Sequence, residues 1–185
     1  LSSRRDFDAF CKRVDHPLSD FRVGIGIASG PGVAGQIGSL DQAKVTVFGP
    51  SVNLASRLEG LTKILHVPIL LDEATAKIVQ ERMGKELARC RRLAVVRPYG
   101  LQTPLVVSEL LPPAGADGQL TDDDLKHYEA ALSAFLSGAW DEAYEELHHV
   151  PASDFGKDML TSFILQHNHT PPPGFDGVIP IQQKQ

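Results

Sequence analysis

The sequence predicts an α+β fold followed by a small helical appendage, on three observations. Up to residue 111, apolar and β-branched runs alternate with stretches of helical periodicity. Proline and glycine then interrupt the chain at residues 112–120. Residues 121–169 carry apolar side chains at helical spacing, and residues 170–185 form a proline-rich tail that we expect to be extended.

Composition limits the classes of function. The chain has 185 residues and a net charge of -5, and its basic residues are not interleaved with aromatic ones, which argues against nucleic-acid binding. Its two cysteines form no disulfide framework and suit a reducing compartment. Without a recognisable signal peptide or membrane span, we expect a cytoplasmic location, either alone or as the cytoplasmic domain of a membrane protein. Membrane contact would then come only through segments outside this chain.

The first elements read as strands and a helix separated by glycines. Residues 21–29 and 44–48 are apolar and β-branched, which predicts two strands, and residues 30–39 form a glycine-punctuated return between them. Gly49 breaks the second strand, and Pro50 suits the first turn of a following helix.

That helix carries the most informative pair in the chain. Asn53 and Arg57 stand at i and i+4, on one face of what reads as a short buried helix. Leu54, Leu58 and Leu61 form a second stripe that would bury against a sheet. A guanidinium with no acidic partner on its own face favours a phosphate. The alternative is a helix-capping amide plus a surface salt bridge.

The remaining elements follow from local signals. We expect a strand at 66–71, a helix at 73–83 with Asp72 as its N-cap, and an antiparallel pair at 86–93 and 105–110. In the appendage we expect helices at 121–136, 139–149 and about 154–167, with Gly138 ending the first. Tyr128 and Trp140 read as core residues. The arginines of the antiparallel pair read as a charged sheet face.

Three ordered stretches, residues 22–30, 34–39 and 46–59, resemble the class III nucleotidyl cyclases, the universal family of adenylate and guanylate cyclases. The resemblance covers roughly residues 20 to 110. It implies a ferredoxin-like catalytic core that works as a homodimer with shared active sites. One protomer would supply two aspartates that bind Mg or Mn, and the other would supply the groups that recognise the nucleotide and the transition-state arginine.

The resemblance assigns roles to particular positions. Asn53 matches the asparagine that orients the ribose, and Arg57 matches the arginine that stabilises the transition state. Thr46 matches a purine-selecting position and leans toward ATP. Cyclisation is the attack of the ribose 3′-hydroxyl on the α-phosphate with pyrophosphate leaving, so positioned cations do most of the catalytic work.

The chain departs from the family pattern in three places. The metal-binding aspartates of the family lie upstream of the strand at 21–29, so we expect an incomplete core without its N-terminal strands and with metal ligands upstream of this chain. Asp6 and Asp8 read instead as a solvated helix face, and the chain starts with Leu1, as an excised segment would. Pro50 removes a side chain that could touch the nucleotide.

The third departure concerns the triphosphate. Tyr99 stands where the family has a phosphate-binding lysine, and tyrosine carries no positive charge. Arg97, two residues earlier, is the candidate replacement. The alternative is that Arg97 is a solvated or interfacial arginine of the basic run.

The appendage resembles a single tetratricopeptide-like helix hairpin, which should pack on the cyclase core or a neighbour. The tail resembles, more weakly, those of some bacterial membrane-attached adenylate cyclases. His167 and His169 read as surface or helix-end histidines and not as a metal pair.

The sequence therefore predicts an adenylate cyclase that converts ATP to cyclic AMP and pyrophosphate in intracellular signalling. The alternatives are a non-catalytic cyclase-like dimerisation or interaction module, and a guanylate cyclase. A diguanylate cyclase would need a Gly-Gly-Asp/Glu-Glu-Phe signature. The glycine pair Gly24 and Gly26 lacks the third glycine of a dinucleotide-binding loop.

Overall fold

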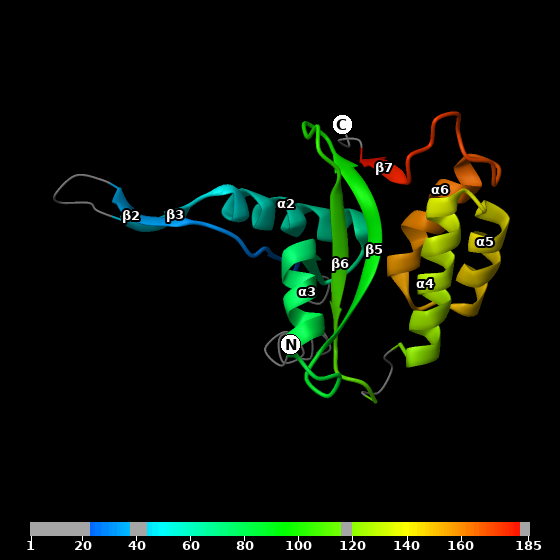
Figure 1. The fold of residues 1–185 in the computed structure, drawn as a ribbon, viewed down its shortest axis with the longest axis horizontal. Helices are drawn as coiled ribbons and strands as arrows, with labels where there is room; N and C mark the ends of the chain where they lie inside the picture. Colours follow the sequence, from blue (N-terminus) through cyan, green and yellow to red (C-terminus); the bar gives the residue numbers. More distant parts are fainter. Residues whose placement is uncertain (1–22, 38–43, 116–119, 182–185) are drawn as a thin grey trace, which may run out of the picture.

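The computed structural model describes residues 23–37, 44–115 and 120–181. Its main sheet has five strands in the order β1-β4-β6-β5-β7 (Figure 1). The strands are β1 (Ile25–Ile27), β4 (Ile69–Asp72), β5 (Arg89–Pro98), β6 (Leu105–Leu111) and β7 (Val178–Ile181). Strands β4, β6 and β5 are antiparallel neighbours, whereas β1 and β7 pair in parallel at the two edges.

A separate hairpin projects away from this sheet. Strands β2 (Val33–Ile37) and β3 (Lys44–Phe48) pair with each other only, and Figure 1 shows them extending beyond the start of α2. The hairpin leaves large apolar side chains in solvent: Val33 is 71% exposed, Val45 80% and Phe48 48%.

Two helices of the first half lie on opposite faces of the sheet. Helix α2 (Pro50–Leu65) packs against Gly26 of β1, which is in register with Leu70 of β4. Helix α3 (Glu73–Arg82) packs with the intervening residues Ile69 and Leu71, whose side chains point to the other face. The fold is thus mixed α+β, as predicted.

The appendage consists of α4 (Asp122–Ser137), α5 (Trp140–His149), the short 3₁₀ turn η1 (Phe155–Lys157) and α6 (Asp158–Gln166). Its helices cover β5 on the same face as α2, because their apolar residues join those of α2 and the sheet in one continuous core. Tyr128, Phe135 and Trp140 are each 1% exposed and form the centre of that contact. Of the two expected partners of the appendage, the core or a neighbour, the structure shows the α+β core.

Most predicted boundaries hold because their signals are local. Helix α3 begins after Asp72, whose carboxylate accepts a hydrogen bond from the Thr75 N–H at 3.0 Å. Helix α4 begins with a capping box between Thr121 and Asp124, and Gly138 ends it at φ 86°.

Several expectations need correction. Strand β1 covers only Ile25–Ile27, and β5 begins at Arg89, later than predicted, and continues to Pro98. Helix α2 has 16 residues and buries only one side. The tail is extended, and its last described residues form β7 against β5. Within the described ranges, every helix is too short or too polar to cross a bilayer.

Candidate functional site: helix α2 and its surroundings

Helix α2 starts at a junction that only glycine can form. Gly49 has φ 151° and ψ 167°, and a Cβ there would meet the Pro31 carbonyl oxygen at 2.8 Å. Pro50 then occupies the first turn, as predicted. The Ser51 hydroxyl donates a hydrogen bond to the Pro31 carbonyl at 3.1 Å. The entry of the chain into α2 is therefore fixed against the loop that leads into the hairpin.

Two glycines bring α2 into direct contact with β1. A Cβ added to Gly26 would overlap the backbone of Ala55 and Glu59, and one added to Gly24 would overlap the Thr62 hydroxyl. The pair Gly24 and Gly26 thus serves close helix–strand packing and not a nucleotide loop. Because the contact is backbone against backbone, α2 has little freedom to slide on the sheet.

The predicted pair lies on the outer side of this fixed helix. Leu58 is fully buried and Leu54 half-buried beneath it, whereas Asn53 and Arg57 are exposed. Neither side chain makes a hydrogen bond or ion pair with any residue the structure describes, so the capping and salt-bridge roles of the alternative reading are not seen there. The amide and the guanidinium share one helix face and remain available to a ligand.

Thr46 lies on the projecting hairpin. It is half-buried in the middle of β3, directly opposite Gly35 of β2. Between the described residues, no hydrogen bond joins Thr46 to Asn53 or Arg57. A single chain therefore does not assemble the base-reading residue and the helix pair through direct contacts.

Arg97 has a partner inside the chain. Its guanidinium lies 3.3 Å from the Asp176 carboxylate, in the tail segment just before β7. Both side chains are partly exposed, so this surface pair is weak. Tyr99, in the turn after β5, is 75% exposed. The structure thus gives Arg97 a surface ion pair within the chain and leaves its charge at the surface, and its role stays a prediction.

The described residues offer no metal site. No group of three or more His, Cys, Asp or Glu side chains in the described ranges could hold a metal ion. Asp6 and Asp8 lie outside those ranges. His169 pairs with Asp141 at 3.0 Å, and His167 hydrogen-bonds to the Phe163 carbonyl within its own helix end.

Sequence reasoning missed a buried ionic cluster. Arg91 of β5, 5% exposed at its side chain, makes two hydrogen bonds of 2.6 Å to Asp154 and also contacts Glu109 at 2.7 Å. The Tyr128 ring lies over its guanidinium at 4.4 Å. Arg89 is equally buried and hydrogen-bonds to Asp122 and to two backbone carbonyls. These arginines are therefore not a solvated sheet face, because the appendage covers them.

The chain is similar to known cyclases along its first half. Residues 6–97 match the family described as the adenylate and guanylate cyclase catalytic domain. Adenylate cyclase 1 of Rhizobium meliloti is 32% identical over 94 residues, which is 51% of this chain and 13% of that protein. An adenylate cyclase of Anabaena cylindrica is 46% identical over 60 residues, 32% of this chain and 12% of that protein.

Two further proteins are similar to this chain, one over a small share of its own length and the other at lower sequence identity. The receptor-type guanylate cyclase gcy-19 of Caenorhabditis briggsae is 40% identical over 65 residues, 34% of this chain and 5% of that protein. The solved adenylyl cyclase CyaB of P. aeruginosa is 24% identical, with a TM-score of 0.40, over 50% of this chain and 44% of that one. The chain thus spans about an eighth or less of the curated relatives' lengths.

The family match covers both the three ordered motifs and most elements of the α+β core. It begins upstream of β1, runs through the hairpin, α2 and α3, and ends within β5. The motif-bearing stretches that contain Thr46, Asn53 and Arg57 all lie inside it. The chain therefore belongs, through residues 6–97, to the class III nucleotidyl cyclase catalytic domain family.

Proposed function

We propose that this chain is part of an adenylate cyclase that converts ATP to cyclic AMP and pyrophosphate, with an active site shared across a homodimer. The observation that supports the proposal best is the outer face of α2. Its carboxamide and guanidinium are exposed, lack partners within the described residues and are carried by a helix that backbone contacts hold against β1.

Each residue type suits its role. The Asn53 amide can both donate to and accept from a ribose hydroxyl, and so hold the sugar while its 3′-oxygen approaches the α-phosphate. Arg57 presents a fixed fork of donors to the phosphate oxygens on which negative charge builds. The Thr46 hydroxyl would read the purine, and Arg97 would bind the triphosphate after leaving Asp176.

The projecting hairpin supports the proposed dimer. Its apolar side chains, Val33, Val45 and Phe48 among them, are exposed to solvent. Gathered apolar side chains on a surface are typical of a protein–protein interface. A second protomer seated on them would bury that surface and bring its own groups toward α2. Divalent metal, Mg or Mn, would polarise the phosphate and activate the 3′-oxygen. The family is metal-dependent, and we assign the metal ligands to no described residue.

The test measures cyclic AMP formation in an active cyclase dimer that contains this chain. Arg57→Ala should lower turnover about a hundredfold or more, since loss of one transition-state donor costs about 3–4 kcal/mol. Lys63→Ala is the matched control, because Lys63 also lies exposed on α2 but pairs with Glu59. Wild-type turnover in Arg57→Ala would reject the assignment. If the dimer forms cyclic GMP from GTP faster than cyclic AMP from ATP, the proposed substrate is GTP and not ATP.

A specific observation favours a second candidate, a non-catalytic cyclase-like dimerisation or interaction module. Tyr99 replaces the expected lysine and stands in solvent, and Arg97 is engaged by Asp176. This candidate predicts that the dimer forms but binds no ATP analogue. Fluorescence titration with a labelled ATP analogue, on wild type and on Asn53→Ala, separates the two candidates.

A further inference from the structure

A groove with a volume of about 580 Å³ lies outside the proposed active site, at the junction of the sheet and the appendage. Three elements line it: the C-terminal part of α3 with Val79 and Gln80, the first half of β5, and α4 from Leu125 to Leu136. Figure 1 shows α4 running along β5 on the side away from β6. Neither Asn53, Arg57 nor Thr46 contributes to this groove.

The groove follows an open strand edge. One edge of β5 pairs with β6 from Arg89 to Val96, but the other pairs with β7 only from Val95 to Pro98. Residues 89–93 therefore have no strand partner on that edge within the part of the chain the structure describes. The Tyr128 hydroxyl donates to the Leu93 carbonyl at 3.0 Å and closes the end of the open stretch nearest β7.

The lining residues give the groove its shape. Four consecutive residues of β5, 89–92, border it together with Ala88 just before the strand, although successive side chains of a strand point to opposite faces. A hollow on one face of the sheet would be lined by alternate residues, so this groove runs along the edge. Five residues of extended chain span about 17 Å. The bordering stretch of α4 spans about 16 Å, so both walls match an extended peptide of about five residues.

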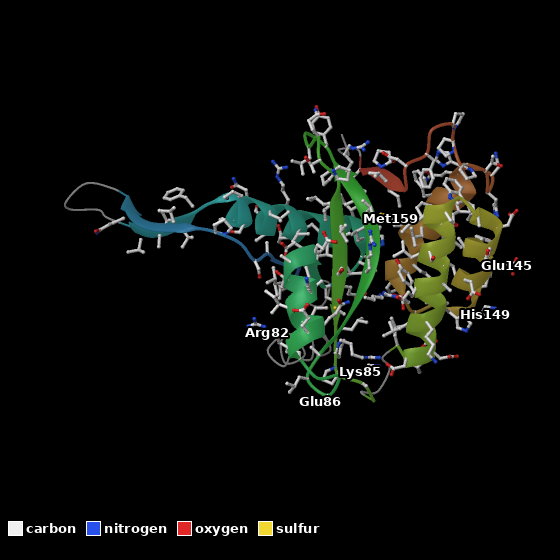
Figure 2. All side chains as sticks on the ribbon, viewed as in Figure 1. Arg82, Lys85, Glu86, Glu145, His149 and Met159 are labelled. Atoms are coloured by element: carbon white, nitrogen blue, oxygen red, sulfur yellow. The ribbon has the colours of Figure 1, made fainter. Side chains whose placement is uncertain are left out.

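The charges favour an acidic occupant. Besides the buried Arg91, four cationic residues line the groove, namely Lys85, Arg89, Arg92 and Lys126, against the carboxylates of Asp122 and Glu129. Lys126 also lies 3.5 Å from the exposed Asp123 carboxylate, and such a surface pair is weak. Asp122 is already bound by Lys85 and Arg89. Arg92 is exposed and makes no hydrogen bond or ion pair with a described residue. Figure 2 shows Lys85 at the lower end of this junction, beside the start of β5.

We propose that this groove binds an extended acidic segment of a partner protein, which adds to the free edge of β5 as a further strand. Backbone hydrogen bonds would supply affinity, and Arg92 and Lys126 would select acidic side chains. Charged side chains on an open edge also discourage pairing with unrelated strands. Arg92 would thus both protect the edge and select its partner. This proposal does not depend on the cyclase reaction.

The first experiment titrates the 185-residue chain into a Glu-Val-Glu-Val-Glu-Val amide that carries fluorescein on its N-terminal amine, at low salt, and follows anisotropy. We expect saturable binding that weakens tenfold or more in Arg92→Glu and in Lys126→Glu. Lys77→Glu is the control, because Lys77 is an exposed lysine of α3 outside the groove. Circular dichroism checks that the variants fold.

The second experiment separates strand addition from simple charge attraction. The same peptide with alternate backbone amides methylated should lose binding, and the alternate amides of 89–93 that face the open edge should gain protection from hydrogen exchange only with the unmethylated peptide. Equal binding of both peptides, protection elsewhere, or no saturation at a millimolar concentration of the chain would overturn the proposal. Self-association of the chain that Arg92→Glu abolishes would identify a second copy as the occupant and would also overturn it.

Discussion

Two arginines on the same side of the sheet show how differently this protein uses one residue type. Arg91 is buried between β5, β6 and the appendage, and its donors are taken by two carboxylates. Arg57 lies exposed on α2, and no described residue pairs with it. A buried guanidinium left unpaired would cost far more than it contributes, so Arg91 needs its partners within the fold. An exposed guanidinium is solvated by water and can stay unpaired until a ligand binds it.

The comparison teaches how to separate structural from functional charge. Arg91 and Asp154 lie 63 residues apart in sequence, yet two short hydrogen bonds join them. Arg57 stands on a helix whose position is fixed by glycines and leucines, so the fold needs the helix but not the guanidinium. Removing the first arginine's partner should damage folding, and removing the second arginine should damage only function.

The largest effect is expected at Asp154. Replacing it with alanine leaves Arg91 without its bidentate partner in a buried site, which should lower the free energy of unfolding by about 3–5 kcal/mol. Urea denaturation followed by tryptophan fluorescence measures this, because Trp140 lies in the same core. Glu145→Ala is the control, since Figure 2 shows Glu145 on the outer side of the appendage. Equal stabilities would mean that the cluster does not hold the appendage.

The next effect separates charge from geometry at Arg57. Arg57→Lys keeps the positive charge but loses the planar fork, so its turnover should lie between wild type and the roughly hundredfold loss of Arg57→Ala. Both variants should keep the wild-type unfolding free energy within about 0.5 kcal/mol, as surface substitutions do. Steady-state kinetics and urea denaturation on the same preparations provide the readouts. A large loss of stability would give Arg57 a structural role.

A smaller effect should follow from the contact beneath α2. Gly26→Ala places a Cβ against the backbone of Ala55 and Glu59, which should cost about 1–3 kcal/mol of stability and displace the site helix. Gly60→Ala is the matched control, because Gly60 lies on the same helix with nothing within 4 Å of its added Cβ. That variant should be stabilised by about 0.5–1 kcal/mol. Thermal unfolding of both variants tests the pair.

The smallest effect concerns Tyr128. Burial raises the pKa of its hydroxyl above the usual tyrosine range, against the lowering effect of Arg91. The unfolded chain would release this proton at a lower pH than the folded chain. Stability should therefore be full below about pH 10 and fall as the pH rises above it.

Ultraviolet titration of tyrosine should accordingly show one late phase that disappears in Tyr128→Phe. That variant also loses the hydrogen bond to the Leu93 carbonyl, which is worth about 1 kcal/mol. If the chain titrates in one step with no late phase, the hydroxyl is not held as described.

Local signals explain what could be predicted of the fold. Asp72, Thr121 and Gly138 mark helix ends through contacts within a few residues, so α3 and α4 were placed almost to the residue. The parallel pairing of β7 with β5 could not be predicted, because a proline-rich run carries no sign of a partner some 80 residues earlier. The ion pair of Arg91 with Asp154 escaped prediction for the same reason.

In the candidate site, too, local signals predict some features and tertiary contacts decide the others. Helical periodicity placed Asn53 and Arg57 on one face with Leu58 beneath, and the structure agrees. The sequence did not reveal that this face is open, because exposure depends on what the sheet and hairpin leave uncovered. Nor did it reveal Asp176 beside Arg97, since tertiary pairing alone brings the tail there. The roles of these residues stay predictions.

The family match stops at residue 97, inside strand β5, but the shared core does not stop there. The segment that matches the family is therefore shorter than the segment that folds around one core. In a chain cut after residue 111, the apolar surface that Tyr128 and Phe135 cover would be open to water. Arg91 would also lose its ion pair with Asp154. Any exchange of the extension between relatives would have to carry the arginine on the strand and the matching carboxylate together.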